Sequence, residues 1–450
     1  MVDYDIVVIG GGPAGIISAV TARHNYPDKR ILLIRKTKGP VISCGIPYMF
    51  TTLETPECNI MGNAPLEKNN IDFKCDEVTG VNREEKSITT KDDTKITYDK
   101  LIIATGSRPF CPQINGHEKN GIYLIEKELE HLKNLKTDFE KARDVVIIGG
   151  GFIGVEFADE FSNSNKNVSL IEAGPRILFH SFDKEFSDIA TEKLKKKRVN
   201  ILTDAKAERF IGDERVRSVR LADGKEIKTD LVVIGIGARP NSGLAEKAGI
   251  KTGERGGILV DEYMRTNDTN IFAVGDCTEE KDFFTRKRTG VMLASTAVAE
   301  ARVAGSSLYG LMLVKENKGT IASYSTVVGD MALASSGMIE KTAREEGFDV
   351  VVGNAECVDR HPGKLPGAKK MKVKLVFSDC GVLLGGQIAG GYSVGEMINI
   401  IGLAIEKSMT MNEIVTLQMA THPKLTAAPT VYPIITATLD AMKNQKISKT

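Results

Sequence analysis

The stretch VVIGGGPAGI, residues 7–16, decides the fold class of this chain. It opens with an apolar run rich in β-branched residues, which is typical of a buried strand. Its glycines fit the pattern GxGxxG, which allows a tight turn, close approach of the backbone to a pyrophosphate and close helix–strand packing. Residues 16–23 read as a helix whose N-terminus faces that anion, and residues 31–34 read as the next strand. The sequence therefore predicts a βαβ unit that binds a dinucleotide through Gly10, Gly12, Pro13, Ala14 and Gly15.

The end of the second strand departs from the usual motif. An acidic residue normally stands there and binds the adenosine ribose. Here Arg35 and Lys36 occupy the position. We therefore expect backbone groups or these two cations to hold the ribose or the pyrophosphate. Taken alone, the motif could also be a βαβ turn that binds nothing.

The pattern occurs again in the stretch VVIIGGGFIG, residues 145–154. The strand that follows, residues 168–171, ends at Glu172, near the spacing of roughly 20 residues expected for a ribose-binding acid. A carboxylate there accepts hydrogen bonds from the ribose and repels a 2′-phosphate, so we expect NADH rather than NADPH. Arg176 keeps NADPH as an alternative. The residues expected to bind this nucleotide are Gly149, Gly151, Phe152, Ile153, Gly154 and Glu172.

Length and composition exclude several classes of protein. A chain of 450 residues fits roughly two to four domains. Its formal net charge of +1 gives no electrostatic basis for binding nucleic acid or an anionic membrane. No apolar run reaches the length of a membrane span, and residues 1–5 lead into a strand without a signal-peptide layout. The seven cysteines form no CxxC pair, so we expect no metal site, no disulfide framework and a cytoplasmic location.

A cysteine stands alone in the stretch PVISCGIPYMF, residues 40–50. No second cysteine lies within five residues of Cys44 on either side. A thiol that a loop delivers to a bound cofactor can relay electrons. A cysteine in an apolar run is more often a packing residue. The residues alone leave both interpretations of Cys44 open.

Four further segments extend the pattern to most of the chain: residues 98–109, 230–241, 269–276 and 293–299. With the two glycine motifs, they resemble the pyridine nucleotide–disulfide oxidoreductases, flavoproteins with two dinucleotide-binding domains. The resemblance implies an α/β fold with two Rossmann-like domains, for FAD and NAD, and an α+β C-terminal dimerisation domain. It places the FAD-binding domain at residues 1–112 and 246–320, the NAD(P)H-binding domain at 113–245 and the dimerisation domain at 321–450.

The resemblance also assigns residues to the FAD. Asp276 is expected at the ribityl chain, and the backbone of Val78 at the adenine. The helix at 293–299 is expected to point its start at the flavin pyrimidine, where a helix N-terminus stabilises negative charge. The other residues expected at the FAD are Ser43, Ala104, Thr105, Gly106, Arg108, Gly275, Thr296 and Ala297. Gly237, in the matching segment after the second glycine motif, is a further expected cofactor residue.

The segment SCGIPY, residues 43–48, resembles the single-cysteine branch of this family. That branch includes coenzyme A disulfide reductases, NADH persulfide reductases, and NADH oxidases and peroxidases. The residue that matches Cys44 lies there beside the flavin and cycles through sulfenate, mixed disulfide or persulfide, as a thiolate that attacks sulfur can. Glu156 matches a glutamate near the nicotinamide and the flavin. Coenzyme A binders often carry several arginines on the first helix, where this chain has Arg23 and His24. These two residues and Tyr48, in the cysteine segment, are the expected substrate residues.

The segment THPKLTA, residues 421–427, resembles the His-Pro segment of the two-cysteine reductases. There the histidine of the partner subunit is an acid–base for the thiol pair, so His422 is expected to complete the active site of a homodimer. A purely structural histidine is the alternative. The glutamate that usually orients this histidine is replaced by Ala427. Tyr392 and Tyr432 are weaker candidates for the tyrosine of the coenzyme A branch.

The residues before this segment predict an α+β arrangement. Residues 371–377 alternate polar and apolar side chains, which predicts a half-exposed strand, and residues 381–390 predict the next strand. Residues 397–407 and 412–417 read as helices. The basic run at 195–198 is expected to be the solvated end of a charged helix.

Together these features predict a cytoplasmic, homodimeric FAD enzyme. NADH would reduce the flavin, and the electrons would pass to a disulfide, persulfide or polysulfide at Cys44, with coenzyme A as a candidate carrier. The main alternative is an NADH oxidase or peroxidase. A reductase of a small carrier protein such as rubredoxin and a flavin-bound redox sensor or scaffold are further alternatives. NADH consumption with several acceptors separates these functions.

Overall fold

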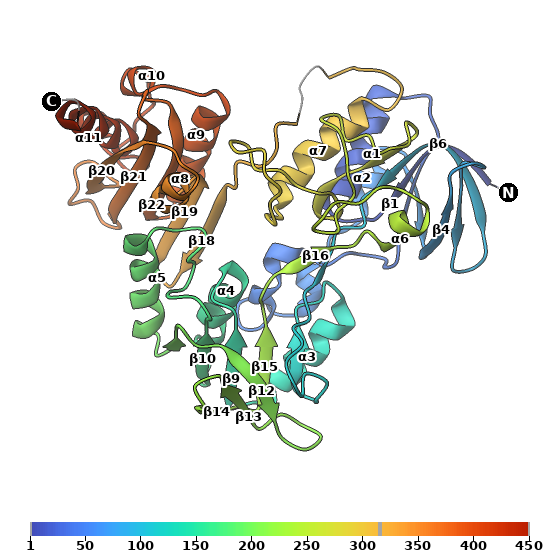
Figure 1. Cartoon of the computed structure of the whole chain (residues 1–450), viewed down its shortest axis with the longest axis horizontal. Coiled ribbons are helices and arrows are strands. Elements are labelled where there is room, and N and C mark those ends of the chain that lie inside the picture. The colour runs from blue at the N-terminus through green and yellow to red at the C-terminus, as the bar shows by residue number, and fades with distance from the viewer. Residues whose placement is uncertain (1, 314–316, 449–450) are drawn as a thin grey trace. The chain divides into compact units, whose positions relative to one another are not determined.

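The computed structural model describes residues 2–313 and 317–448, and the chain forms two compact units (Figure 1). The chain leaves unit 1 and later returns to it, as a discontinuous FAD-binding domain requires. The domain boundaries given above stay a prediction. Unit 1 comprises Met1–Cys111, Leu124–Thr137 and Gly237–Thr320, and unit 2 comprises Pro112–Tyr123, Asp138–Ile236 and Ile321–Thr450.

Unit 1 is built on one seven-stranded sheet. Its strands and main helices are β1 (Val2–Ile9), α1 (Pro13–Asn25), β2 (Ile31–Arg35), β3 (Asp72–Cys75), β4 (Val78–Asn82), β5 (Ser87–Thr90), β6 (Lys95–Ile103), β17 (Ile271–Ala273) and α7 (Ala294–Ser306). The order is β3-β2-β1-β6-β5-β4, and β1 runs parallel to both β2 and β6. The start of β6 pairs with β5, and its end pairs in parallel with the returning strand β17. The predicted first βαβ unit is therefore present.

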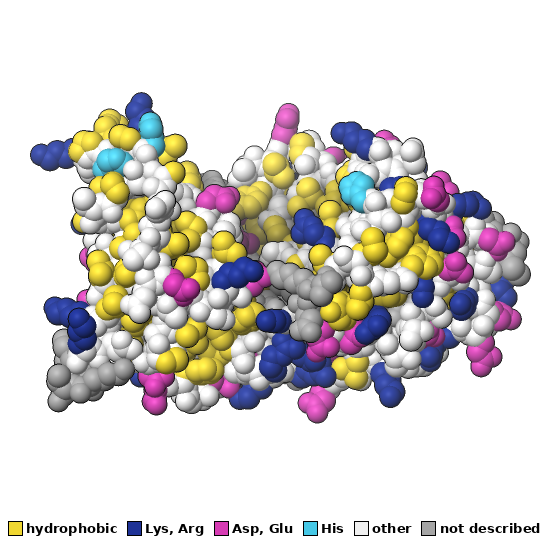
Figure 2. Space-filling view, turned by 90° about the horizontal axis from the view of Figure 1, so that it is seen from above, with side chains coloured by type: hydrophobic (Ala, Val, Ile, Leu, Met, Phe, Trp, Pro, Cys, Tyr) yellow, Lys and Arg dark blue, Asp and Glu magenta, His cyan; other side chains and the backbone are white. Residues whose placement is uncertain are grey.

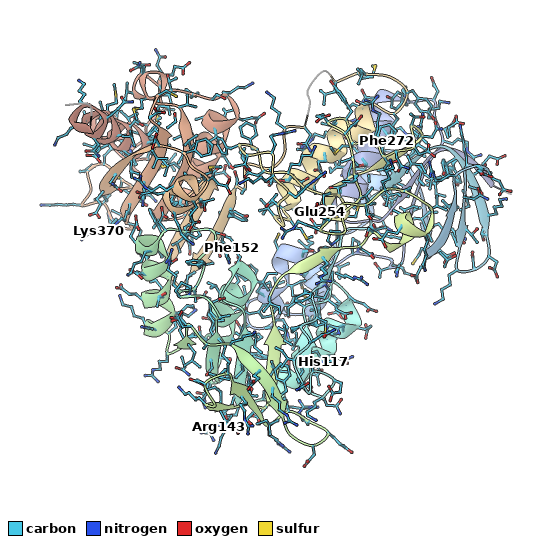
Figure 3. The ribbon with its side chains drawn as sticks, viewed as in Figure 1. His117, Arg143, Phe152, Glu254, Phe272 and Lys370 are labelled. Atoms are coloured by element: carbon cyan, nitrogen blue, oxygen red, sulfur yellow. The ribbon has the colours of Figure 1, made fainter. Side chains whose placement is uncertain are left out.

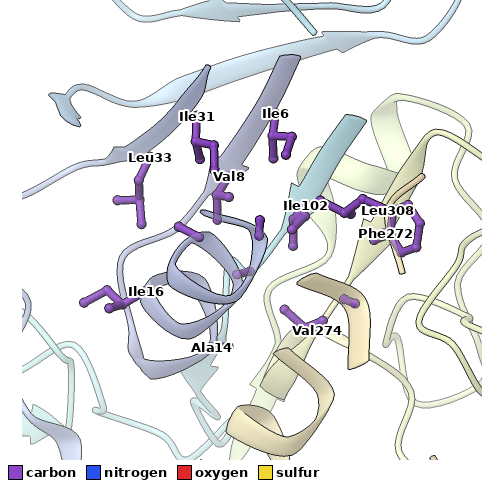
Figure 4. Packing of buried hydrophobic residues seen from close by; sticks show 14 of the residues in the cluster. Ile6, Val8, Ala14, Ile16, Ile31, Leu33, Ile102, Phe272, Val274 and Leu308 are labelled. Carbon is purple, nitrogen blue, oxygen red and sulfur yellow. The ribbon is translucent and has the colours of Figure 1, made fainter. Parts of the chain in front are cut away.

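Apolar clusters cover both faces of this sheet, because successive side chains of a strand point to opposite faces. Ile6 and Val8 of β1 pack with residues of α1 and α7 in one cluster, while Val7 belongs to the other (Figure 4). The two helices lie side by side and very close. A Cβ atom at Gly305 of α7 would lie 2.8 Å from the carbonyl oxygen of Ser18 in α1.

Unit 2 contains the repeat of this arrangement. Its parallel sheet and helices are β8 (Ile122–Leu124), β9 (Asp144–Ile148), α4 (Phe152–Phe161), β10 (Asn167–Ile171), α5 (Lys184–Lys196), β11 (Asn200–Leu202) and β15 (Leu231–Ile234). The strand order is β11-β10-β9-β15-β8. The predicted second βαβ unit is β9-α4-β10, in which the two strands run parallel. An antiparallel sheet of β12 (Ala207–Ile211), β13 (Ser218–Leu221) and β14 (Glu226–Lys228) accompanies it.

The C-terminal part of unit 2 is an antiparallel sheet with helices. Its elements are β18 (Tyr324–Val328), β19 (Met331–Gly337), α8 (Glu340–Glu345), β20 (Val350–Val358), β21 (Lys370–Ser378), β22 (Leu383–Gly390), α9 (Val394–Glu406), α10 (Met411–Val415) and α11 (Pro433–Ser448). The strand order is β18-β19-β22-β21-β20, with α9 against β19 and β22 and α11 against β20 and β21. The predicted strands and helices are all present. The predicted half-exposure of residues 371–377 is wrong, because residues 373–377 are all buried, and even Lys374 is 5% exposed.

The surface agrees with the balanced composition. Figure 2 shows acidic and basic side chains interspersed over the face that it displays. Within residues 2–313 and 317–448, no helix has the length and apolarity to cross a bilayer. The same residues contain no cluster of three or more His, Cys, Asp or Glu side chains able to hold a metal ion.

Candidate active site

The turn between β1 and α1 depends on close backbone contacts. Gly10 has a φ of +112°, and a Cβ atom there would lie 2.1 Å from the carbonyl oxygen of Ala104. A Cβ atom at Gly15 would lie 2.0 Å from the carbonyl oxygen of Gly10, so glycine is required at both positions. At Gly12, the N-cap of α1, no described residue beyond its chain neighbours comes within 4 Å of the Cβ position. This space lies at the helix N-terminus, where free amides and the helix dipole favour a phosphate.

Arg35 takes the place of the ribose-binding acid and is 5% exposed. Its aliphatic stem lies against Gly11. Its guanidinium donates to the carbonyl oxygens of Thr37 (2.9 Å) and Lys38 and to Oδ1 of Asn63. The Nη1 atom is buried and has no hydrogen-bond partner among the described residues. Buried donors normally have a hydrogen-bond partner. The oxygen atoms of a bound nucleotide could accept from Nη1, which favours a nucleotide site over a turn that binds nothing.

A second turn of unit 1 presents Asp276. Its Oδ2 accepts hydrogen bonds from Oγ of Ser107 at 2.7 Å and from Nζ of Lys127 at 3.3 Å. The preceding residue, Gly275, has a φ of +76°, and its Cβ position lies 3.1 Å from Cβ of Ala14 in α1. The carboxylate is thus held beside the start of α1. It retains lone pairs that can accept hydroxyl groups, as the ribityl chain of FAD requires.

Cys44 lies in a 3-10 turn, η1 (Ser43–Gly45), on the loop after β2. Ile46 is 2% exposed and Met49 1% exposed, whereas Cys44 is exposed. Ile46 and Met49 fill the core and the thiol lies outside it, which favours the reactive interpretation of Cys44 over a packing role. Cys277 is the contrasting case, because it is fully buried and burial raises its pKa to about 11. An exposed thiol can ionise and reach a substrate.

The second glycine motif, in unit 2, repeats the first in detail. A Cβ atom at Gly149, where φ is +107°, would lie 2.5 Å from the carbonyl oxygen of Gly235. Glu172 occupies the position that Arg35 has in the first motif, with Oε2 accepting from the amide of Gly150 at 2.6 Å and Oε1 from that of Gly174 at 2.5 Å. The carboxylate is therefore fixed at the end of β10 next to the turn. Its position fits a nucleotide with free ribose hydroxyls.

Helix α4 carries Glu156 and is covered by β18. Oγ1 of Thr326 in β18 donates to Oε1 of Glu156 at 2.8 Å. One turn earlier, the ring of Phe152 stacks on that of Tyr324, with centroids 4.8 Å apart (Figure 3). Burial raises the pKa of Glu156 to about 7, although the hydrogen bond from Thr326 lowers it. Glu156 can therefore gain or lose a proton near neutral pH.

His422 lies on an exposed turn of unit 2. Its Nδ1 accepts a hydrogen bond from the amide of Lys424 at 3.3 Å, and its own amide donates to Oγ1 of Thr426 at 3.1 Å. A neutral imidazole whose Nδ1 accepts carries its proton on Nε2. The amide of Lys424 thus holds the imidazole ring through its Nδ1 atom.

Two family matches cover nearly the whole chain. Residues 4–301 match the pyridine nucleotide-disulphide oxidoreductases, and residues 323–431 match the dimerisation domain of these proteins. The chain belongs to the pyridine nucleotide-disulphide oxidoreductase family. It is accordingly an NAD(P)H-dependent flavoprotein oxidoreductase, which confirms the resemblance and the predicted fold class.

Related proteins bear names of two kinds. An NADH oxidase of Methanocaldococcus jannaschii is 30% identical over 97% of this chain and 98% of that protein. An NAD(P)H coenzyme A polysulfide/persulfide reductase of Pyrococcus horikoshii is 34% identical over 86% of this chain and 87% of that protein. The structure of an NAD-dependent persulfide reductase from A. fulgidus matches with a TM-score of 0.90 at 32% identity, covering 98% of this chain and 84% of that one.

The predicted cofactor residues of this oxidoreductase fall into two sets, and their roles stay predictions. Eighteen lie in unit 1: Gly10, Gly12, Pro13, Ala14, Gly15, Arg35, Lys36, Ser43, Val78, Ala104, Thr105, Gly106, Arg108, Gly237, Gly275, Asp276, Thr296 and Ala297. Unit 2 contains Gly149, Gly151, Phe152, Ile153, Gly154 and Glu172.

The three expected substrate residues differ in whether their side chains are available to a ligand. The guanidinium of Arg23 donates to four backbone carbonyl oxygens, which belong to Pro27, Lys29, Asn69 and Asn70. The guanidinium of Arg23 therefore links the segment after α1 to residues 69–70 through these hydrogen bonds. His24 is exposed, and Tyr48 is 39% exposed beside the Cys44 turn.

Three residues at the oxidoreductase site were not predicted. Ser107 and Lys127 hold Asp276, as described above. Glu300 of α7 is 2% exposed, and its Oε2 accepts from the amide of Gly275 at 2.6 Å. Burial raises the pKa of Glu300 well above its ordinary value, and neighbouring Glu280 raises it further. Ser107 directly follows the turn Thr105–Gly106, so its place in that segment could have revealed it. Lys127 lies in no motif that the sequence shows.

Proposed function

We propose that this protein is a homodimeric, NADH-dependent flavoenzyme that reduces a disulfide, persulfide or polysulfide through Cys44. The observation that carries the proposal is the exposure of Cys44 next to buried Ile46 and Met49 on the loop after the first βαβ unit. The names of the Pyrococcus and A. fulgidus relatives, which are sulfur reductases, support it.

We assign the FAD to residues 1–112 and 246–320 and the nicotinamide nucleotide to residues 113–245. FAD, when bound, supplies the two-electron chemistry between the nucleotide and the acceptor. The open space at Gly12 would receive its pyrophosphate, and Asp276 would accept the ribityl hydroxyls. Glu172, fixed by two amides, would bind the ribose of NADH and disfavour the 2′-phosphate of NADPH. Arg176, whose guanidinium lies 4.7 Å from the ring centre of Phe179, keeps NADPH as the alternative.

The chemical role of Cys44 follows from thiolate reactivity. The Cys44 thiolate attacks one sulfur of the substrate, forms a mixed disulfide with it and displaces the other sulfur as a thiolate. His422 of the partner subunit would donate from Nε2 to the displaced sulfur, since its Nδ1 accepts from the backbone. A coenzyme A persulfide belongs to this substrate class.

An NADH oxidase or peroxidase is the second candidate, supported by the name of the Methanocaldococcus jannaschii relative. In that function Cys44 would be oxidised to a sulfenate by peroxide and reduced again. Transfer to a carrier protein would not require Cys44 at all. A sensor or scaffold would show no turnover with any acceptor.

The test compares Cys44→Ser with Cys58→Ser, a control that removes another exposed thiol of unit 1. Each purified protein is titrated anaerobically with NADH and then given coenzyme A disulfide, a persulfide, peroxide or oxygen. Cys44→Ser should retain bleaching of the flavin absorbance by NADH and lose turnover of sulfur substrates by about a thousandfold or more, since a hydroxyl cannot replace the thiolate. Wild-type rates in Cys44→Ser with sulfur substrates would overturn the proposal, and loss with peroxide alone would favour the peroxidase.

A further inference from the structure

We propose that Asn59 is the positioning residue of the Cys44 turn and that Gly45 is glycine because the Asn59 amide occupies the adjacent space. The inference rests on the proposed role of Cys44 as the active thiol. It concerns a residue outside the two glycine motifs and the cysteine segment 43–48. Asn59 ends the 3-10 turn η3 (Pro56–Asn59) and is 4% exposed.

Asn59 binds the residue two positions before Cys44 with both its backbone and its side chain. Nδ2 of Asn59 donates to the carbonyl oxygen of Ile42 at 2.9 Å. The amide of Ile42 donates back to the carbonyl oxygen of Asn59 at 3.0 Å. These two hydrogen bonds fix the chain at the entry to the turn.

Gly45, at the end of the turn, lies against the Oδ1 side of the Asn59 side-chain amide. A Cβ atom at Gly45 would lie 1.9 Å from Oδ1 and 2.7 Å from Cγ of Asn59, far inside van der Waals contact. Gly45 lies in the 3-10 turn η1 and not in the left-handed region, so its backbone conformation does not require glycine. Space alone excludes a side chain, and Asn59 occupies that space.

The flanking backbone explains why this amide is well placed. Val41 and Ile60 form an antiparallel bridge, and the amide of Met61 donates to the carbonyl oxygen of Pro40 at 2.9 Å. The two segments separate immediately after this ladder, where the turn begins. Asn59 stands at the point of separation and contacts the chain on both sides of Cys44.

A fixed turn matters because sulfur exchange needs an aligned nucleophile. A displacement of about 1 Å of a reacting group can cost on the order of a hundredfold in rate. Hydride transfer from the nucleotide does not use the thiol. Loss of Asn59 should therefore slow the sulfur half-reaction and leave the nucleotide half-reaction unchanged.

The experiment uses three variants of the full-length, FAD-loaded protein: Asn59→Ala, Gly45→Ala and the double variant. Asn59→Ala should slow sulfur turnover by about 10- to 100-fold. Gly45→Ala should slow it at least as much, because the new methyl group displaces the Asn59 amide. In the double variant that clash is absent, and alanine suits the 3-10 backbone better than glycine does. The double variant should thus turn over faster than Gly45→Ala.

A second readout separates local positioning from general damage. Peptide mapping after iodoacetamide treatment gives the alkylation rate of each cysteine. The alkylation rate of Cys44 should change in the single variants, while that of exposed Cys380 stays the same. Buried Cys277 should stay unmodified, and its alkylation would report unfolding. Asn69→Ala is the matched control, since Nδ2 of Asn69 also donates to a backbone carbonyl oxygen, that of Pro65 at 2.8 Å. It should leave every rate unchanged.

The outcomes divide the two hypotheses. If the double variant is no faster than Gly45→Ala, or if Cys44 is alkylated at the wild-type rate in Asn59→Ala, the positioning role is wrong. Loss of turnover in Cys44→Ser would still support the proposed function in that case. If Cys44→Ser keeps its sulfur turnover, the proposed function fails, and the alkylation rates still decide whether Asn59 fixes the turn.

Discussion

Glu156 shows how the surroundings of one side chain set its charge. Helix α4 buries the carboxyl against β18, and burial raises its pKa to about 7 from an ordinary value of 4.5. Thr326 supplies a hydrogen bond that opposes this rise. The folded protein therefore binds more protons at Glu156 than the unfolded chain does between about pH 4.5 and about pH 7. The contribution of Glu156 to stability is complete below that window and is lost as the pH rises through it.

The Glu156→Gln variant tests this assignment. The wild type should lose about 3 kcal/mol more stability than the variant between about pH 4.5 and about pH 7. Urea unfolding followed by circular dichroism at several pH values measures the difference. Thr326→Val should raise the pKa of Glu156 in the folded protein further and extend the upper end of the window. Parallel stability curves for wild type and Glu156→Gln would show that Glu156 titrates normally.

Glu172 makes a second prediction at the level of one residue. Because its carboxylate is fixed beside the ribose position, wild-type kcat/KM should be higher with NADH than with NADPH. Glu172→Ala should narrow that ratio by on the order of tenfold, since the repulsion of a 2′-phosphate is removed. Steady-state kinetics with both nucleotides decide it. A wild type that prefers NADPH would show that Arg176 dominates the site.

The sequence predicts these sites only where the reason is local. Gly15 and Gly154 lie against the carbonyl oxygens of Gly10 and Gly149 in their own turns, so the pattern GxGxxG reveals this requirement. Asn59 and Lys127 meet their partners only after distant segments fold together, and neither residue type is unusual for its position. Arg23 is proposed from its place on the first helix, and nothing in the sequence indicates that four carbonyl oxygens accept from its guanidinium.

Among the secondary-structure elements, β21 departs most from its sequence pattern. Its alternating lysines predicted a half-exposed strand, yet Nζ of Lys374 lies 3.0 Å from Asp183, 2.8 Å from Glu185 and 2.7 Å from Glu340. Burial alone would lower the pKa of Lys374, but the three carboxylates outweigh it and hold the pKa above its ordinary value. These acids come from α5, α8 and the residue before α5, so no local pattern could reveal them. The cluster joins β21 to both helices.

Lys374→Met should therefore destabilise the protein strongly. Removal of the ammonium group leaves the neighbouring carboxylates without this cation. The loss of one partner of a buried ion pair lowers the free energy of unfolding by about 3–5 kcal/mol. Lys184→Met is the control, because Lys184 pairs with Asp188 on the surface, where their side chains are 74% and 48% exposed. It should cost about 0.5 kcal/mol or less. The midpoints of urea unfolding compare the two, and equal midpoints would contradict the buried cluster as a stabilising link.

For the whole molecule, the C-terminal part suggests subunit contact. Residues 323–431 match a dimerisation domain, and large apolar side chains of this part are exposed, among them Tyr392 (79%), Leu425 (65%) and Leu439 (54%). Leu425 lies three residues from His422, on the same turn. A twofold dimer would bring the same surface of both subunits together.

Mixed dimers test whether His422 acts across the interface. Cys44→Ser and His422→Ala subunits with different affinity tags are co-expressed, and the doubly tagged dimer is purified. If His422 serves the thiol of its partner, one site of this dimer contains both native residues and about half of the wild-type sulfur turnover per dimer returns. Turnover no higher than that of the two parent homodimers would place His422 in the site of its own subunit or outside it.

The late return of the chain to unit 1 has a consequence for biosynthesis. Lys100 and Asn270, 170 positions apart, are joined by a side-chain hydrogen bond where β6 meets β17. A ribosome must therefore complete all of β9-α4-β10 before the last strand of the first sheet exists. Closing so long a loop is slow, whereas the repeat inside it closes locally. The nucleotide half can thus fold early in translation, and the nascent chain becomes able to capture its flavin only after the returning strand has left the exit tunnel.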